Sequence, residues 1–459
     1  MKNIHLCTIL ICLMISIVSL SAQNWGTIYH STESLTVGDI DMPNDSTIWI
    51  IGNETPILNS RFLRGSSGQF YRTANGGNTW QAGIIAEGEP FITSISAVNS
   101  QMAWASVVDT NEASAIYKTI NGGTTWQMTS APFSASSYCN FVHFWNAKEG
   151  LAMGDPLNNR YEIYLTGNGG NTWTAVSDTN ILRPNSIYET GFNNTYSVVG
   201  NHIWFFTSSS RVFHSANKGV TWQVADTQLG NNPYGGSIVF NSKMQGLAVK
   251  SDYDNANANF HTTISQSLDT GKTWQKLSIS NPDVYFFDIK ALPNNTFLAS
   301  VVNKGDFLMG QYATLMSYDL GKSWITINED VKVNALCVSP QGNRIIGGSL
   351  NTLGQKLEVY KLLESPFLRL LTPSVLDAQI SLSPNPTADQ LNIQLTYKEA
   401  SSFRLNINNL LGELVYFEDF KDVSTINKSL NIKHLTSGTF IVTIANSTGS
   451  LSRKFVKTE

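Results

Sequence analysis

Short stretches of alternating apolar and polar residues recur through most of the chain, each bounded by Gly, Asn, Asp or Ser. Alternation with a period of two is typical of half-buried β-strands. Between residues 24 and 364 the pattern repeats in seven successive units, each with an innermost, a second and a third strand. Innermost strands are predicted, for example, at Ile92–Val98, Ser237–Asn241 and Val333–Ser339. The pattern predicts an all-β protein built from repeats.

The second and third strands of the seven units can be aligned with one another. The predicted second strands are Thr47–Gly52, Met102–Val107, Gly150–Gly154, His202–Thr207, Gly246–Lys250, Thr296–Val301 and Arg344–Ser349. The predicted third strands are Gln69–Thr73, Ala115–Thr119, Glu162–Thr166, Arg211–Ser215, Thr263–Ser267, Ala313–Ser317 and Lys356–Leu362. A fixed repeat period near 50 residues, filled with short strands, indicates a propeller-type architecture.

An eight-residue motif follows six of the seven third strands and reads Ser/Thr, any, Asp/Asn, any, Gly, any, Thr/Ser, Trp. Its copies are Thr73–Trp80, Thr119–Trp126, Thr166–Trp173, Ser215–Trp222, Ser267–Trp274 and Ser317–Trp324. The start-to-start spacings are 46, 47, 49, 52 and 50 residues. The six copies therefore occupy equivalent places in the repeat.

The motif has the chemistry of a tight turn between two strands. The Asn or Asp side chain can accept hydrogen bonds from nearby backbone N–H groups, and the Gly allows a positive φ. The Trp opens the next strand and is expected to pack between neighbouring units. The expected structural residues are Asn75, Trp80, Asn121, Trp126, Asn168, Trp173, Asn217, Trp222, Asp269, Trp274, Asp319 and Trp324. The motif resembles the Asp-box, or BNR repeat, of β-propellers in the superfamily of sialidases, sortilin-like receptors and photosystem II assembly-factor-like proteins.

Six motifs against seven sets of strands leave one outer strand missing. The segment Asn24–Tyr29 resembles a strand that follows a motif, including its Trp25. Pairing it with Lys356–Leu362 would close the ring and remove an open sheet edge. We therefore predict a seven-bladed β-propeller over residues 23–364, with a six-bladed ring, as in sialidases, as the alternative.

The chain begins with a pattern typical of a secretory signal peptide at residues 1–22: Lys2, an apolar run from Leu6 to Leu20, and the small residues Ser21 and Ala22. Outside this segment only Cys139 and Cys337 remain, and we expect both to be small buried residues. Charged residues make up 14% of the chain and the net charge is −4. This charge argues against a nucleic-acid partner.

After a linker at residues 365–378, residues 379–459 predict a small Ig-like β-sandwich. Its expected strands are Ile380–Leu395, Ser402–Phe417, Ile426–Ile432, Phe440–Ile444 and Leu451–Val456. The segments Ser383–Pro386, Leu391–Ile393, Asn409–Val415, Leu435–Val442 and Lys454–Lys457 resemble, in order, the type A sorting domain of the type IX secretion system, apart from Phe440 where that family commonly has Tyr. The resemblance implies Sec export, contact with the type IX machinery and a location at the cell surface or in the medium.

Three loops supply the candidate ligand-binding residues on the face formed by blade-to-blade connections and by loops between second and third strands. The loop 53–67 carries Arg61 and Arg64; the turn 154–160 carries Asp155 and Arg160; and the loop 252–255 carries Asp252 and Asp254. The last resembles the start of a calcium loop but lacks the required Gly and Glu. Solvated loops with no ligand are the alternative interpretation of all three.

No catalytic or metal-binding motif stands out. A sialidase needs three arginines for a carboxylate, a Tyr–Glu pair and an Asp acid/base, and Phe62-Leu63-Arg64-Gly65 is not the Phe/Tyr-Arg-Ile-Pro sequence of that family. We expect His143 to line the channel without a metal. The leading hypothesis is a secreted or surface propeller, without cofactor and monomeric, that binds a protein or glycan. The alternative is a glycoside hydrolase with an atypical active site.

Overall fold

The computed structural model describes residues 25–458 with interruptions at 54–67, 89, 112, 131, 135–136, 232–234, 255–258, 280–282, 293–295, 304–309, 330, 341, 350–355, 364–377, 410–413 and 447–448. The predicted signal peptide and nearly all of the predicted linker lie outside the described residues, as do Arg61 and Arg64. Every regular element in the described ranges is a β-strand. Within these ranges, no helix could span a membrane.

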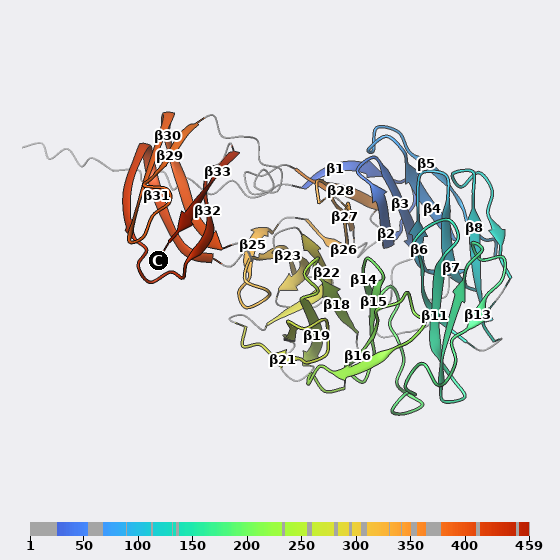
Figure 1. The fold of residues 1–459 in the computed structure, drawn as a ribbon. Coiled ribbons are helices and arrows are strands. Elements are labelled where there is room, and N and C mark those ends of the chain that lie inside the picture. Colours follow the sequence, from blue (N-terminus) through green and yellow to red (C-terminus); the bar gives the residue numbers. More distant parts are fainter. Residues whose placement is uncertain are drawn as a thin grey trace, which may run out of the picture.

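Seven four-stranded antiparallel sheets make up the larger part of the chain (Figure 1). In chain order, the first sheet contains β2 (Thr36–Asn44), β3 (Thr47–Asn53), β4 (Gln69–Thr73) and β5 (Gln81–Ile84), and the second contains β6 (Phe91–Ala97), β7 (Ala103–Val108), β8 (Ser114–Thr119) and β9 (Gln127–Met128). The third sheet contains β10 (Cys139–Phe144), β11 (Gly150–Leu157), β12 (Arg160–Thr166) and β13 (Thr174–Ala175). The fourth sheet contains β14 (Tyr196–Val199), β15 (His202–Phe206), β16 (Arg211–Ser215) and β17 (Gln223–Asp226).

The fifth sheet contains β18 (Gly236–Phe240), β19 (Gly246–Asp254), β20 (Asn259–Ser267) and β21 (Gln275–Lys276). The sixth contains β22 (Val284–Leu292), β23 (Thr296–Asn303), β24 (Gln311–Ser317) and β25 (Ile325–Asn328). The seventh contains β26 (Val333–Val338), β27 (Ile345–Ser349), β28 (Glu358–Leu362) and the N-terminal strand β1 (Trp25–His30). Their order follows the predicted sequence of innermost, second and third strands, and second strands such as β3 and β7 are buried on both faces.

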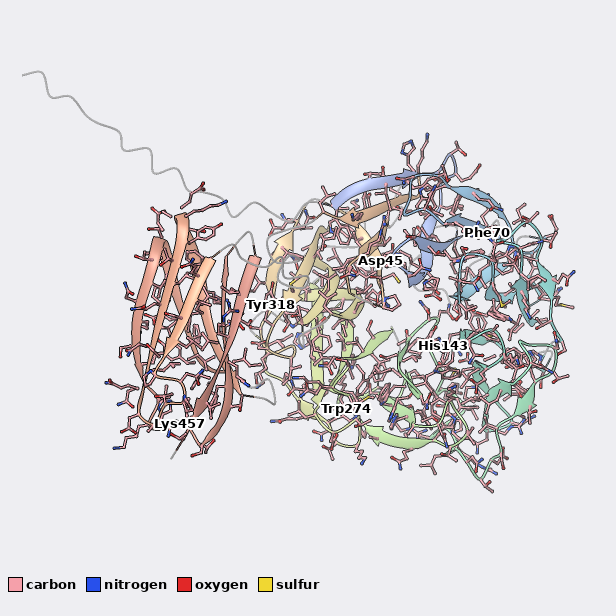
Figure 2. All side chains as sticks on the ribbon, turned by 45° about the horizontal axis from the view of Figure 1, so that its top comes forward. Asp45, Phe70, His143, Trp274, Tyr318 and Lys457 are labelled. Atoms are coloured by element: carbon pink, nitrogen blue, oxygen red, sulfur yellow. The ribbon has the colours of Figure 1, made fainter. Side chains whose placement is uncertain are left out.

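The seven sheets surround a central channel. One strand from each sheet lines the same cavity, and the residues that do so include Asp39, Ile95, His143, Tyr196, Ile238, Lys290 and Cys337. These residues belong to β2, β6, β10, β14, β18, β22 and β26, so the innermost strand of every sheet faces the channel. Figure 2 shows His143 near the middle of this ring. The prediction that His143 lines the channel is confirmed.

The ring is closed by the two ends of the repeat region. Strand β1 pairs antiparallel with β28, with Trp25 opposite Leu362 and His30 opposite Glu358. The Trp25 side chain is buried, and its indole Nε1 donates a hydrogen bond of 3.0 Å to Oγ1 of Thr314 in the neighbouring sheet. The predicted closure by an N-terminal strand is confirmed.

The six motif turns share one hydrogen-bond pattern. In the second copy, the Thr119 hydroxyl accepts a bond from the N–H of Gly123 (2.9 Å) and donates to Oδ1 of Asn121 (3.0 Å). The same Oδ1 accepts the N–H of Thr125 (3.0 Å). Gly123 has φ +86°, which favours glycine because a Cβ is strained there. The other five copies repeat these three bonds.

Neighbouring sheets are joined at these turns. Nζ of Lys118 and Nε1 of Trp104 both donate to the carbonyl oxygen of Gly169 in the next sheet, each at 3.1 Å. The Trp126 ring packs edge-on against Trp49 of the preceding sheet, with centroids 5.9 Å apart. The motif Trp therefore contacts an adjacent sheet, as its large apolar ring predicts.

The C-terminal residues form one five-stranded sheet of β29 (Ala378–Ser383), β30 (Gln390–Asn409), β31 (Leu414–Asn431), β32 (Gly438–Asn446) and β33 (Gly449–Lys457). The two halves of the long strand β30 contribute to a single buried cluster, so the sheet folds over its own core. Two predicted strand boundaries are wrong. The predicted strand Ile380–Leu395 is interrupted at residues 384–389, between β29 and β30. The predicted strand Ser402–Phe417 covers the end of β30 and the start of β31. Strand β30 continues through the polar residues near its middle while it pairs with β31.

Candidate functional site

The channel holds a cavity of about 270 Å³ with charged residues in its wall. Asp39 and Asp41 come from β2, and Lys290 comes from β22. Nζ of Lys290 lies 3.1 Å from Oδ1 of Asp288, and its side chain is 30% exposed. Nδ2 of Asn194 donates to Oδ1 of Asp39. The cavity therefore contains both signs of charge and an amide.

The carboxylates in the channel tie neighbouring sheets together. Asp39 accepts the N–H groups of Ile40 and of Ile95 in β6, both at 2.8 Å. Asp41 accepts the N–H of Ala97 in β6 at 2.6 Å. In the next sheet, the hydroxyl of Ser94 takes the corresponding place and accepts the N–H of Val142 at 2.9 Å. A serine can thus replace the aspartate in this structural role.

Burial changes the pKa values of the titratable groups in the channel. It raises the pKa of Asp39 to about 7 and that of Asp41 to about 6, although the backbone N–H groups oppose the shift. Burial alone would lower the pKa of Lys290, but Asp288 and other neighbouring groups raise it. Burial lowers the pKa of His143 to about 4, so this imidazole is neutral near pH 7.

The predicted candidate Asp155 anchors a neighbouring loop. It lies at a register shift between β11 and β12, and the hairpin turn falls at Asn158 and Asn159, which have φ of +53° and +60°. Oδ1 of Asp155 accepts Nδ2 of Asn140 at 2.9 Å and the N–H of Gly191 at 3.1 Å. The predicted turn 154–160 is wrong in its extent, because two residues with positive φ suffice for the hairpin.

Of the other candidates, Arg160 and Asp252 form ion pairs with neighbours, and Arg61 and Arg64 lie outside the described residues. Nη1 of Arg160 lies 3.5 Å from Asp178, and Nη2 lies 3.7 Å from Glu162. Oδ2 of Asp252 lies 3.0 Å from Nζ of Lys250. Asp252 and Asp254 are in strand β19 and not in a loop as predicted, because the hairpin with β20 extends to their positions. Neither Arg160 nor Asp252 lines the channel cavity.

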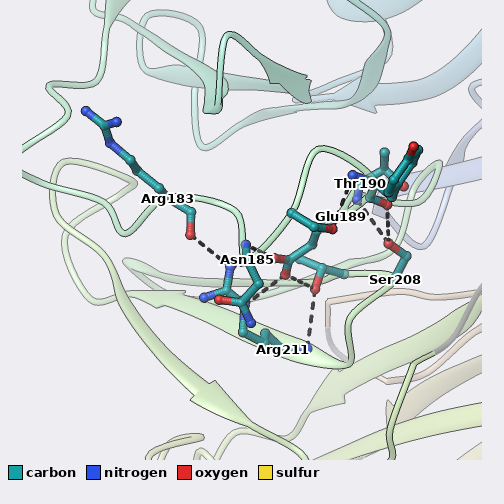
Figure 3. Close-up of polar contacts among 9 residues, drawn as sticks. Arg183, Asn185, Glu189, Thr190, Ser208 and Arg211 are labelled. Carbon is teal, nitrogen blue, oxygen red and sulfur yellow. Dashed lines mark hydrogen bonds and ion pairs between the residues drawn. The ribbon is translucent and has the colours of Figure 1, made fainter.

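The loop 176–195, between β13 and β14, is the element that Asp155 and Arg160 hold. A buried ion pair fixes it from the other side: Nη2 of Arg211 donates to Oε2 of Glu189 at 2.6 Å, and Nε donates to Oε1 at 2.9 Å (Figure 3). Burial would raise the pKa of Glu189, but bonds from Arg211 and Thr207 hold it below its ordinary value. Asn194, at the end of the loop, reaches Asp39 in the channel.

Tyr161 lies beside this ion pair, so a Tyr, a Glu and one of the three arginines that a sialidase needs lie in one place. Its side chain is only 3% exposed, and the Glu189 side chain is fully buried. Burial raises the pKa of the Tyr161 hydroxyl, whereas a nucleophilic tyrosine needs to lose its proton readily. The group therefore has the contacts of a packing cluster.

The described ranges give little support for a metal site or for a reactive thiol. They contain no group of three or more His, Cys, Asp or Glu side chains that could hold a metal ion. Cys139 and Cys337 are free and buried, as predicted, and burial raises the pKa of both thiols.

Comparison with known families identifies the C-terminal part of the chain. Residues 381–458 match the secretion system C-terminal sorting domain. This type IX sorting tail implies interaction with the type IX secretion machinery and export to the cell surface or the medium. Among curated proteins, none matches the sequence.

Solved structures similar to this chain include two of YCF48 and one of a GH74 enzyme. YCF48 bound to D1 peptide is similar with a TM-score of 0.51 and 16% identity, over 74% of this chain and 97% of that chain. YCF48 from Cyanidioschyzon merolae has a TM-score of 0.49 and 15% identity, over 74% and 98%. The GH74 enzyme of Niastella koreensis has a TM-score of 0.48 and 11% identity, over 95% and 75%. The likeness to YCF48 bound to D1 peptide and the seven sheets show a β-propeller fold, and residues 381–458 add a type IX sorting tail.

Sequence reasoning missed the loop 176–195 and its anchor Glu189. Two signals were available. The interval between Trp173 and the next predicted second strand, at His202, is long, and Arg211 is an isolated cation in a buried strand that requires a carboxylate partner. Neither signal identifies Glu189 among the acidic residues of the chain.

Proposed function

We propose that the protein is an exported seven-bladed β-propeller that binds a protein or glycan partner through the loop 176–195. The supporting observation is that buried contacts hold this loop in place while one of its large side chains is exposed to solvent. Glu189 and Gly191 are tied to Arg211 and Asp155, while Tyr188 is 81% exposed. Loops placed by a rigid scaffold are common carriers of binding residues.

The sorting tail supports a role outside the cell. We propose that residues 1–22 direct Sec export and that residues 379–459 are read by the type IX machinery. The propeller, residues 23–364, then reaches the surface or the medium. Its seven sheets, closed by β1, support a ring of seven blades.

No specific observation favours the alternative function, a glycoside hydrolase. Hydrolysis of a glycosidic bond requires two carboxyl groups placed on either side of the bond. Asp39 and Asp41, which line the described cavity, both accept backbone N–H groups of neighbouring strands. Their geometry matches that of a structural tie, as the corresponding Ser94 indicates.

Binding and hydrolysis can be separated on the purified full chain. We expect binding to immobilised peptides or glycans and no release of reducing sugar from those glycans. Asp39→Asn is the matched variant for hydrolysis. If the unchanged chain released sugar and this variant lost that release while binding was retained, the glycoside hydrolase would be favoured. Absence of binding to peptide and glycan panels alike would overturn the proposed function.

A further inference from the structure

Three of the six motif turns carry an Asn-Gly dipeptide on the surface. The three asparagines are exposed, and the dipeptides are Asn75-Gly76, Asn121-Gly122 and Asn168-Gly169. In such a pair the backbone nitrogen of the glycine can attack Cγ of the asparagine, because no side chain hinders the approach. Ammonia leaves, and water opens the resulting succinimide ring to give aspartate or isoaspartate. The fold therefore places three possible deamidation sites at equivalent positions.

Contacts between neighbouring sheets explain why a glycine follows the asparagine in these three turns. A cationic side chain of the preceding sheet lies against each glycine and leaves little room for a Cβ atom. The pairs are Arg344 with Gly76, Arg72 with Gly122 and Lys118 with Gly169, where a Cβ atom would lie 2.7, 3.0 and 2.8 Å from the cationic side chain. The dipeptide is thus a consequence of how the sheets meet.

The reacting groups are held in the same way in all three turns. The N–H groups of Gly76, Gly122 and Gly169 donate at 2.8, 2.9 and 2.8 Å to carbonyl oxygens of the hairpin between the first two strands of their own sheet. The Asn side chain is held as well, since Oδ1 accepts a backbone N–H and Nδ2 donates to the Thr hydroxyl four residues later. Ring closure therefore requires the turn to open, and its rate follows how often the turn opens.

Two of the three turns have a further bond that opposes opening. The carbonyl oxygen of Gly76 accepts Nη2 of Arg344 at 2.5 Å. That of Gly169 accepts Nζ of Lys118 and Nε1 of Trp104, each at 3.1 Å. In both turns the cation of the preceding sheet holds the peptide group that follows the reacting nitrogen.

The second motif turn lacks this bond. Nη1 of Arg72 donates to Oε1 of Gln81 at 3.2 Å, and in the described part of the chain no donor is bonded to the carbonyl oxygen of Gly122. We propose that Asn121 is the deamidation site of the folded propeller. A hydrogen bond from a charged donor changes an opening equilibrium by roughly tenfold. Asn121 therefore reacts before the other two asparagines.

The aspartate product fits the turn, whereas the isoaspartate product does not. In the fifth motif copy, Oδ2 of Asp269 accepts the hydroxyl of Thr273 at 2.6 Å. This bond replaces the one from Nδ2 of Asn121 to Oγ1 of Thr125, which is 2.9 Å long. An aspartate at position 121 keeps the turn by reversing one hydrogen bond. Isoaspartate adds a methylene group to the backbone and shifts the groups that make these bonds.

The test incubates the purified full chain at mildly alkaline pH and follows the conversion of amide to acid by mass spectrometry of tryptic peptides. We expect Asn121 to react roughly tenfold faster than Asn75 and Asn168 in the folded chain, and all three to react at similar rates in urea. Asn217 is the internal control, because its turn makes the same bonds but a lysine, Lys218, follows it. It should stay unmodified.

Lys118→Met removes the charged donor to Gly169 and should raise the rate at Asn168 severalfold while the rate at Asn121 stays the same. Equal rates at the three asparagines of the folded chain, or a slower reaction at Asn121 than at either of the others, would overturn the proposal. A faster reaction at Asn121 in urea as well would trace the difference to the local sequence and would also overturn it.

Discussion

At the residue scale, the motif separates two kinds of stabilisation that the sequence places side by side. Asn121 holds a turn through polar contacts and is exposed, whereas Trp126 contributes apolar area between sheets. Polar atoms of an exposed turn can exchange their partners for water, but a ring removed from between two sheets leaves a void. The two residues should therefore differ in their energetic weight.

We expect Trp126→Ala to lower the free energy of unfolding by about 3 kcal/mol, because the ring contacts with Trp49 and Phe70 are lost. Asn121→Ala should cost roughly 1 kcal/mol, since water can reach the N–H of Thr125. Thermal and urea unfolding of both variants check this order. Equal or reversed effects would show that the turn bonds, and not the inter-sheet ring, dominate at this site.

Asp39 predicts a specific pH dependence of stability. Its pKa is raised to about 7 in the folded protein from an ordinary value of 3.8, so the folded state binds the proton more tightly. The resulting stabilisation is complete below pH ~4 and is lost as the pH rises through about 7. Asp39→Asn removes this titration. The destabilisation caused by the variant should thus be largest near pH 4 and shrink by a few kcal/mol (order of magnitude) toward pH 8.

Urea unfolding of both proteins at several pH values measures this difference. A destabilisation by Asp39→Asn that does not change between pH 4 and 8 would contradict the assigned burial of a carboxyl group in the channel.

At the element scale, a buried ion pair is one of the anchors of the loop 176–195. Breaking such a pair by removing one partner leaves an uncompensated charge, which typically costs about 3–5 kcal/mol. We expect Arg211→Met to release the loop, seen as faster hydrogen exchange of the Thr190 and Gly191 amides. Arg211→Met combined with Glu189→Leu should regain much of the loss, because no charge remains buried. Arg183→Met is the control, as its side chain points away from the pair; unchanged exchange in Arg211→Met would refute the anchoring role.

The strands show what the sequence can and cannot predict. The sequence located β4, β8, β12, β16, β20 and β24, because each of them ends at the Ser or Thr that opens a motif turn. Hairpin ends were less accurate: Asp252 and Asp254 are polar and were expected in a loop, yet backbone pairing with β20 continues beside them. Pairing depends on the partner strand, which local composition does not reveal.

The candidate site was less predictable than the fold for a related reason. Asp155 and Arg160 were selected because they are charged residues in a turn, a feature that binding residues and loop anchors share. The contact of Asp155 with Gly191 joins residues far apart in the sequence, and that of Asn194 with Asp39 crosses the channel. Only the closed ring brings such residues together, so their roles depend on the tertiary structure.

At the scale of the whole molecule, the ring places the first and last strands of the repeat region together. Trp25 lies opposite Leu362, so the first residue of β1 and the last residue of β28 lie at the same end of one sheet. Residues 1–22 and 379–459, which we propose to direct export, both lie outside the paired segments 25–30 and 358–362. Closure and export therefore use different parts of the chain, and the two can be tested separately.

We expect deletion of residues 23–30 to destabilise the propeller strongly, whereas deletion of residues 364–459 should leave its unfolding temperature unchanged. The first deletion removes the buried Trp25 and its bond to Thr314, and it exposes the backbone edge of β28. An open edge is also a template for pairing with another chain, so this variant should form oligomers on size-exclusion chromatography.

A milder variant separates packing from strand pairing. Trp25→Ala keeps the backbone pairing of β1 and should cost about 3–4 kcal/mol without creating oligomers. If both variants with altered residues 23–30 unfolded at the temperature of the unchanged chain, the strand would be dispensable and the ring would be held by the inner strands alone. If the tail deletion instead lowered that temperature, the propeller would depend on residues 364–459, and the two could not be independent units.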